Sequence, residues 1–112
     1  MIQVSSGRLN MGLKDSTTTP LVSPALTYTG AAFSVNGYGR LVGSATADVN
    51  GTLYVEQSSD GGANWDVVSS FVVTGGKTVP YSVEAVCPHA RLRYVSGSTQ
   101  ATFRLYVFAR TT

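Results

Sequence analysis

The sequence predicts an all-β domain, a two-sheet antiparallel β-sandwich or jelly roll of about seven or eight strands with an extended N-terminal arm. Two observations support this fold class. From residue 26 onward, runs rich in Val, Thr, Tyr and Phe are separated by Gly, Asn, Asp and Pro at intervals of roughly eight to twelve residues. No window of helical length places apolar side chains at helical spacing. The 112 residues fit one domain.

Strands are expected wherever apolar side chains recur at period two between these turn residues. The last strand has the clearest pattern, because Phe103, Leu105 and Val107 are predicted to share one face. The predicted strands are Leu26–Val35, Arg40–Val49, Thr52–Ser58, Trp65–Thr74, Thr78–Val86, Ala90–Ser96 and Ala101–Arg110.

Three short segments between these strands have the composition of hairpin turns. Asn50-Gly51 is the strongest, because both residue types tolerate positive φ. Gly75-Gly76 is a second candidate and Ser96-Gly97-Ser98 is a third. Each turn therefore predicts that the strands on its two sides are antiparallel neighbours.

Residues 1–25 differ from the sandwich domain predicted over residues 26–112. They contain a Thr run, Pro20 and Pro24, and no sustained period. We predict an extended arm with at most one short strand near Ile2–Val4. A frayed tail is the alternative, but the segment is too apolar for a solvated tail and should be covered by this domain or a neighbour.

The composition favours a protein that works against another surface. Only 12% of the residues are charged, whereas 26 are Ser or Thr and 12 are Gly. A free monomer usually carries charge on about a quarter of its residues. The net charge of +2 comes from scattered Arg and Lys rather than a basic stripe, so a nucleic-acid partner is not expected.

The sequence also indicates the compartment in which the chain is made. Cys87 is a single cysteine, so an intrachain disulfide is excluded. The N-terminus lacks the basic start and apolar run of a signal peptide, and no apolar stretch approaches 18 residues. We expect a chain made in a cytoplasm, with no membrane partner.

Ser58, Asp60, Gly62 and Trp65 match the pattern S-x-D-x-G-x-x-W. This pattern resembles the Asp-box of sialidases and other β-proteins. Asp60 can accept hydrogen bonds from backbone amides of its own turn, and glycines permit positive φ there. One copy in 112 residues cannot build a propeller. The motif is therefore interpreted as a structural turn, with Trp65 packed beneath it.

A broader resemblance covers the chain from Gly51 to about Tyr106. The strand ending in the Asp-box, followed later by Ala90-Arg91-Leu92-Arg93-Tyr94-Val95, resembles the second half of discoidin-like jelly rolls. The layout is also similar to small β-sandwich proteins of tailed-phage structural gene clusters, such as capsid decoration (cement) proteins. Discoidin-type domains are normally secreted, longer and disulfide-closed, and this sequence shows none of these features.

The sequence offers no convincing catalytic, cofactor or metal site, so an enzyme is not expected. Cys87 and His89 flank a proline in a geometry that is poor for a nucleophilic pair, and zinc requires three or four ligands. A half-buried cysteine and a surface histidine are the simpler interpretation. Asp48, Asn50 and Asp60 are a weaker calcium alternative, without the dense oxygen spacing of a known loop.

The last predicted strand is apolar on both faces, because Tyr106 and Phe108 lie opposite Phe103 and Leu105. Such a strand is either central in a closed structure or pressed against a partner. In a small sandwich no further layer covers the outer face of a sheet, so a partner subunit is the simpler explanation for these exposed apolar side chains. The candidate interface residues are Arg91, Arg93, Arg104, Tyr106, Phe108 and Arg110.

From these residues and the phage resemblance we expect a virion structural protein. The most specific expectation is a capsid decoration protein that is made in the host cytoplasm. It would bind the major capsid protein as a homotrimer, and its N-terminal arm would add to the contact. The alternative is a non-catalytic carbohydrate-binding module of a phage tail or fibre. That module would stack sugars on Trp65 or on surface tyrosines.

Overall fold

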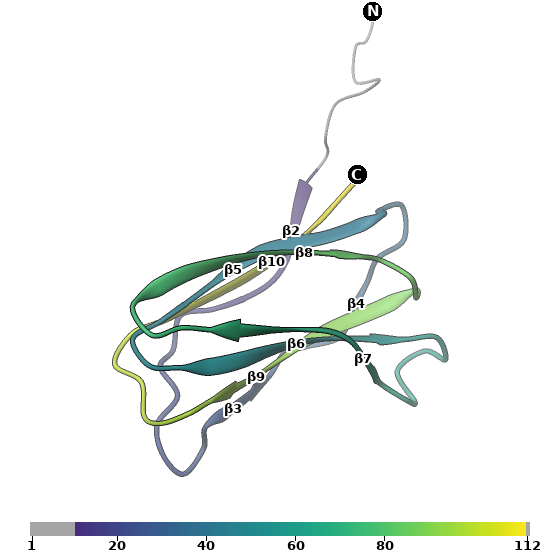
Figure 1. The fold of residues 1–112 in the computed structure, drawn as a ribbon. Helices are drawn as coiled ribbons and strands as arrows, with labels where there is room; N and C mark the ends of the chain where they lie inside the picture. Colours follow the sequence, from purple (N-terminus) through teal and green to yellow (C-terminus); the bar gives the residue numbers. More distant parts are fainter. Residues whose placement is uncertain (1–10, 112) are drawn as a thin grey trace, which may run out of the picture.

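The computed structural model describes residues 11–111 and confirms an all-β sandwich of two antiparallel sheets (Figure 1). The first sheet has the order β2 (Met11–Thr17), β10 (Phe103–Arg110), β5 (Arg40–Ala47) and β8 (Lys77–Glu84). The second has the order β3 (Thr27–Thr29), β9 (His89–Ser96), β6 (Gly51–Ser58) and β7 (Asp66–Val73), and β4 (Phe33–Ser34) also pairs with β9. A membrane-spanning helix is absent from residues 11–111.

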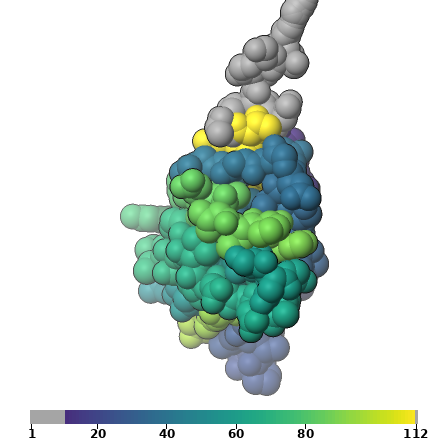
Figure 2. All heavy atoms as spheres, turned by 90° about the vertical axis from the view of Figure 1, so that its right-hand side faces the viewer, coloured from purple at the N-terminus to yellow at the C-terminus, as the bar shows by residue number. Residues whose placement is uncertain are grey.

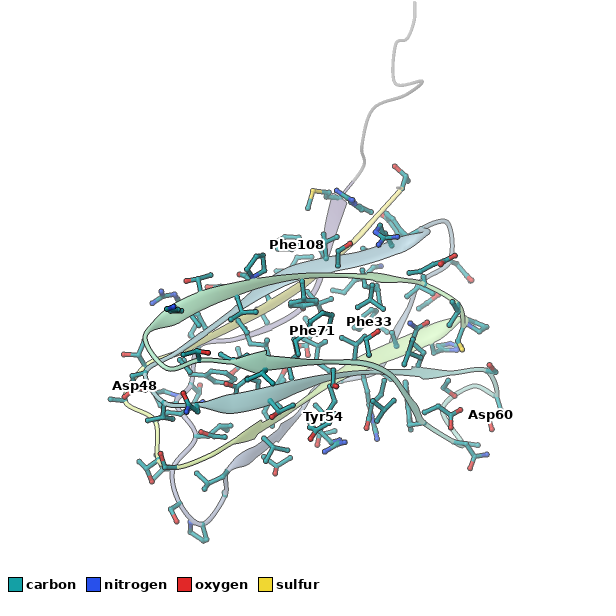
Figure 3. All side chains as sticks on the ribbon, in the orientation of Figure 1. Phe33, Asp48, Tyr54, Asp60, Phe71 and Phe108 are labelled. Atoms are coloured by element: carbon teal, nitrogen blue, oxygen red, sulfur yellow. The ribbon has the colours of Figure 1, made fainter. Side chains whose placement is uncertain are left out.

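The core lies between the two sheets and has the composition that period-two alternation predicts. On β10, Phe103, Leu105 and Val107 are buried, which confirms the predicted inner face of that strand. Phe103 packs on Tyr94 of β9, with 4.8 Å between the ring centroids. Phe71 also lies between the layers, whereas Phe108 lies on the outside (Figure 3).

The hairpin predictions for three turns are wrong. Asn50-Gly51 joins β5 to β6, Gly75-Gly76 joins β7 to β8, and Ser96-Gly97-Ser98 precedes β10. In each case the two strands lie in different sheets, so the turn crosses between layers. Among the described strands, β6 and β7 are consecutive strands that pair as a hairpin. Turn composition predicts a reversal of the chain but not the layer that the chain enters next.

The three crossings lie at one end of the sandwich and are hydrogen-bonded to one another. Asn50 Oδ1 accepts a bond from Gly75 N at 2.8 Å, and its carbonyl accepts one from Gly97 N at 2.8 Å. The Asp48 carboxylate accepts bonds from the backbone amides of Ala101 and Thr102. These bonds, led by the one from Thr102, lower the pKa of Asp48. The acceptor residues therefore hold the crossings together.

The expectation for the N-terminal segment needs a correction at residues 11–17. These residues form β2, which pairs with β10 on both sides of one unpaired residue, Lys14. A β-bulge at Lys14 interrupts the pairing and breaks the period-two pattern, so no strand was expected here. The suggested strand near Ile2–Val4 lies outside the described residues. The predicted strand Leu26–Val35 is in fact two short strands, β3 and β4, that both pair with β9.

Tyr81 ties three strands of the first sheet together. It lies opposite Gly43 on β5, and its hydroxyl reaches over that glycine to donate to the Tyr106 carbonyl on β10 at 2.6 Å. Burial, together with the negative charge of Asp15, raises the pKa of Tyr81 well above its usual range. A Cβ on Gly43 would collide with the Tyr106 carbonyl and approach the Tyr81 hydroxyl to 2.6 Å. Glycine is therefore required at position 43.

We predict that Gly43→Ala lowers the free energy of unfolding by about 2 kcal/mol, because the methyl group overpacks the sheet and displaces the Tyr81 hydroxyl. Urea unfolding followed by circular dichroism measures this loss. Gly12→Ala is the matched control, since a Cβ there meets only the Tyr38 hydroxyl at an ordinary 3.5 Å. Equal stability of the two variants would contradict the proposed packing.

Candidate functional site

The interface residues expected from the sequence divide between the two outer faces of the sandwich. Four of them lie on β10 in the first sheet, and the other two lie on β9 in the second sheet. The two groups therefore cannot form one continuous patch. The first group is Arg104, Tyr106, Phe108 and Arg110, and the second is Arg91 and Arg93.

The outer side of the first sheet carries an apolar stripe. Phe108 lies opposite Leu13 of β2 on one side and Val42 of β5 on the other. Leu13 is 55% exposed and Met11, on the same strand, is 54% exposed. Tyr106 continues the stripe along β10. These residues form a contiguous apolar surface over three neighbouring strands.

Arginines border this stripe at both ends. Arg110 lies opposite Arg40 at one end, and Arg104 lies on β10 at the other end. Arg40 Nε donates to Ser82 Oγ at 2.7 Å, so its guanidinium is tied to the neighbouring strand β8. Aromatic residues, Met and Arg together are typical of protein interfaces. We call this set the β10 face: Met11, Leu13, Arg40, Val42, Arg104, Tyr106, Phe108 and Arg110.

The outer side of the second sheet is organised around one buried carboxylate. Glu56 on β6 is 5% exposed. Its two oxygens accept bonds from Arg91 Nε at 2.7 Å and from Arg93 Nε at 2.8 Å. Both arginines lie on β9, where alternate residues face the same side. The pairing of β6 with β9 thus brings the three charges together.

Aromatic rings complete this cluster. The Arg91 guanidinium lies 4.5 Å from the centroid of Trp65, and that of Arg93 lies 4.2 Å from the centroid of Tyr54. Such cation–π contacts stabilise a planar charge on a ring face. Each ring therefore has one face occupied by a guanidinium, which leaves less ring surface for stacking a sugar.

The ion pairs determine the charge state of Glu56. Burial alone would raise the pKa of Glu56, but the hydrogen bonds and positive charges of Arg93 and Arg91 outweigh it and hold the pKa below its usual value. Glu56 is therefore ionised in the folded chain at neutral pH. The carboxylate fixes the two arginines, so their Nε donors are not free for a ligand.

The Asp-box residues form the turn between β6 and β7. Ser58 Oγ accepts a bond from Gly62 N at 2.9 Å and donates to Asp60 Oδ1 at 2.8 Å. Asp60 also accepts bonds from the backbone and side-chain amides of Asn64. Gly61 and Gly62 have φ of 75° and 99°, which side chains resist.

The hydrogen bonds of this turn shift the acidity of its central residue. The Asn64 side-chain and backbone bonds, followed by the bond from Ser58, lower the pKa of Asp60 to about 2. The Trp65 ring passes close to Gly62, where a Cβ would meet it at 3.6 Å. Both carboxylate oxygens of Asp60 thus accept hydrogen bonds from within the turn.

The hydrogen-bond partner that the structure gives Cys87 is Ser59 rather than His89. Ser59 Oγ donates to Cys87 Sγ at 3.1 Å, which links the β6–β7 turn to the segment between β8 and β9. Figure 2 shows the teal turn residues and the green residues of that segment side by side at the near end of the molecule. The buried His89 Nδ1 has no hydrogen-bond partner. The hydrogen bond to Cys87 thus holds the β6–β7 turn against this segment.

The calcium alternative is wrong. Asp48 and Asp60 lie at opposite ends of the sandwich (Figure 3), and the oxygens of both accept backbone hydrogen bonds. Within residues 11–111, no group of three or more His, Cys, Asp or Glu residues could hold a metal ion.

Sequence reasoning missed two parts of these surfaces. Glu56 lies 35 residues from Arg91, and nothing local to either residue signals the pair. Period two gives a partial signal, since alternation along Thr52–Ser58 places Tyr54 and Glu56 on the face opposite Leu53. The contribution of Met11 and Leu13 was missed because β2 itself was not expected.

The comparisons with known proteins agree with this fold. The family model described as "Uncharacterised protein YqxG N-terminal domain" matches residues 5–110. No curated protein matches the chain. The solved structure titled "Crystal structure of PBSX exported protein XepA" is 25% identical, with a TM-score of 0.76. That alignment covers 97% of this chain but 39% of XepA, so this chain spans well under half of that protein.

A second solved structure has nearly the same length. The chain titled "Bacillus endospore appendages form a novel family of disulfide-linked pili" is 13% identical, with a TM-score of 0.62 over 100% of this chain and 96% of that chain. At this identity the similarity shows a shared fold. The discoidin-like and decoration-protein resemblances remain predictions.

We predict that Glu56→Gln lowers the free energy of unfolding at pH 7 by about 2 kcal/mol, because two charge-assisted hydrogen bonds are lost while both arginines stay partly solvated. The lowered pKa of Glu56 means that its contribution is complete above the unfolded value and is lost as the pH falls through the folded value. The difference between wild type and variant, measured by urea unfolding, should therefore shrink from pH 7 to pH 3.

Glu84→Gln is the control for this experiment. Glu84 is exposed, so the substitution should change the free energy of unfolding by less than about 0.5 kcal/mol. A Glu56→Gln effect that is no larger than this, or that does not depend on pH, would show that the paired arginines do not stabilise the second sheet.

Proposed function

Because the chain belongs to the YqxG N-terminal domain family, we propose that it is a non-catalytic module that attaches to a large protein assembly through the β10 face. The observation that carries this proposal is the apolar stripe of that face, bordered by arginines at both ends. A stripe that exposes Met11 and Leu13 by more than half requires a cover, since contiguous apolar surface is costly in water.

The composition and the relatives support an assembly role. With 12% charged residues, the chain has little charge to keep isolated copies apart. XepA is titled an exported protein, and the fold also occurs in the subunit of appendages titled pili. A domain that works on the outside of a particle is consistent with both.

The specific form that we propose is a virion structural protein, a decoration protein that stabilises the head lattice by binding the major capsid protein. The β10 face would lie on the capsid surface, and the N-terminal segment of residues 1–25 would contact neighbouring subunits. Several copies, three in the simplest lattice-matched arrangement, would strengthen individually weak contacts through multivalency. Synthesis in the host cytoplasm is part of this proposal.

A carbohydrate-binding function is the weaker candidate. Sugar stacking needs an accessible aromatic face, and the rings of Trp65 and Tyr54 each carry a guanidinium. Glycan binding is therefore treated as an alternative outcome of the binding experiment below.

We predict that Leu13→Lys weakens binding to the assembly by at least about tenfold, because a charge is placed beside Phe108 in a stripe that the contact would desolvate. Cosedimentation with purified heads of the phage whose genome encodes the chain measures this binding. Val86→Lys is the matched control, since Val86 is 60% exposed and lies outside the β10 face. Thermal unfolding verifies that both variants fold.

Three results would contradict the proposal. Wild-type protein that does not sediment with heads removes the capsid assignment. Equal binding by Leu13→Lys and the control removes the β10 face as the contact. Glycan binding without head binding, measured on a glycan array, favours the carbohydrate alternative.

A further inference from the structure

Two guanidinium groups on the outer side of the second sheet keep hydrogen-bond donors that the fold does not use. Arg91 and Arg93 each donate to Glu56 through Nε. Among residues 11–111, no acceptor is bound to the terminal Nη groups of either arginine, and these groups are not among the buried polar atoms that lack a partner. The Nη groups are therefore open to solvent, and their N–H donors are available to a ligand.

The positions of these donors are fixed before any ligand arrives. Glu56 holds both Nε atoms, and the guanidinium carbons lie 4.5 Å and 4.2 Å from the ring centroids of Trp65 and Tyr54. The side chains of Arg91 and Arg93 are 27% and 30% exposed. A ligand that binds them therefore has little side-chain freedom left to remove, which favours binding.

The charges of this cluster do not cancel. Two arginines face one carboxylate, so one positive charge is left over. The neighbours across the strands are uncharged, since Thr29 lies opposite Arg93 and Val67 lies opposite Glu56. Asp66 is the next residue of β7, and alternation directs it away from the face that carries Glu56. A carboxylate group complements this cluster, because guanidinium donors and carboxylate oxygens form strong charge-assisted hydrogen bonds.

An apolar hollow continues from the cluster along the same outer face. Its volume is about 330 Å³, and Thr52, Val72 and Val95 line it together with the backbone of the β5–β6 crossing. Thr52 lies opposite both valines, so the three side chains form one row across the strands. Val95 follows Arg93 by two residues on β9, which separates them by about 7 Å along the strand.

We propose that this surface binds an extended acidic segment of another protein. A carboxylate of the segment lies on the Nη groups of Arg91 and Arg93, and an aliphatic side chain two residues away lies in the hollow. The spacing agrees, because alternate side chains of an extended chain point the same way at intervals of about 7 Å. We call this surface the arginine face: Thr52, Tyr54, Val72, Arg91, Arg93 and Val95.

The chemistry of the arginine face favours a protein segment over a sugar. The hollow is lined by valines, which suit an aliphatic side chain and leave sugar hydroxyls without partners. The cluster also already places a guanidinium on one face of each ring. The arginine face lies on the sheet opposite to the β10 face, so this proposal does not rest on the attachment proposed above.

The tryptophan of this chain reports binding directly. Trp65 is the only tryptophan in the sequence, and its ring contacts Arg91. The probe is a synthetic peptide with the sequence Glu-Ser-Val-Ser written twice, which places acid and valine two residues apart in both directions. We expect a saturable change in tryptophan fluorescence. Replacing each glutamate of the peptide by glutamine should weaken binding by at least about tenfold.

Matched variants at one exposed position test the cation site. Thr29→Glu places a carboxylate opposite Arg93, where it competes for the Nη donors, and should weaken peptide binding by at least about tenfold. Thr29→Gln has nearly the same shape without the charge and should bind like the wild type. Thr29 is exposed and leaves the Glu56 pairs untouched, so both variants should fold, which thermal unfolding verifies.

Two further variants separate the parts of the contact. Val72→Ser should weaken binding of the valine peptide severalfold but leave unchanged the binding of a peptide with serine in place of valine, because Val72 lines the hollow. Leu13→Lys, on the β10 face, should bind the peptide like the wild type. Loss of particle binding and loss of peptide binding are therefore distinguishable results.

Several outcomes would overturn the proposal. One is a wild-type protein whose fluorescence shows no saturable change at millimolar peptide. Equal binding of the glutamate and glutamine peptides, or of the wild type and Thr29→Glu, would remove the cation site. Tighter binding of a galacturonate oligosaccharide or of inorganic phosphate than of the peptide would show that the occupant is not a protein segment.

Discussion

The whole structure depends on the constraint that the chain changes sheets at nearly every turn. Three crossings between the layers lie at one end, where Asp48 and Asn50 bind the backbone amides of other crossings. Because of these crossings, consecutive strands such as β9 and β10 lie on opposite sides of the core. Most neighbours within a sheet are therefore distant in sequence. The side chains that meet on either outer face come from distant parts of the chain for the same reason.

Period-two alternation was enough to predict the fold class and the inner face of β10, because a buried face leaves a local signal in every strand. Turn composition failed at Asn50-Gly51 because a tight reversal suits a crossing as well as a hairpin. It succeeded at Asp60, where the motif supplies its own hydrogen bonds and the adjacent strands do pair. β2 was not predicted as a strand, because its bulge disrupts the period-two pattern and its large apolar residues face outward.

The surfaces were harder to predict than the core. Tyr106 and Phe108 were predicted from one strand alone, but the stripe that they belong to also needs Leu13, which β2 supplies from the other end of the chain. Arg93 was placed in the same candidate interface from the sequence. Its place on the opposite sheet, held by Glu56, follows from strand pairing that no local pattern reveals.

The few charged residues of this chain have different roles on the two outer faces. On the second sheet, a buried carboxylate fixes two arginines against aromatic rings, so the scarce charge stabilises the domain itself. On the first sheet, the arginines border the apolar stripe instead of covering it. A chain that used its charge for solubility would place it over Leu13 and Phe108. Because this chain places the arginines at the ends of the stripe, the middle of the β10 face stays apolar, and this distribution is the physical basis on which an assembly function is proposed.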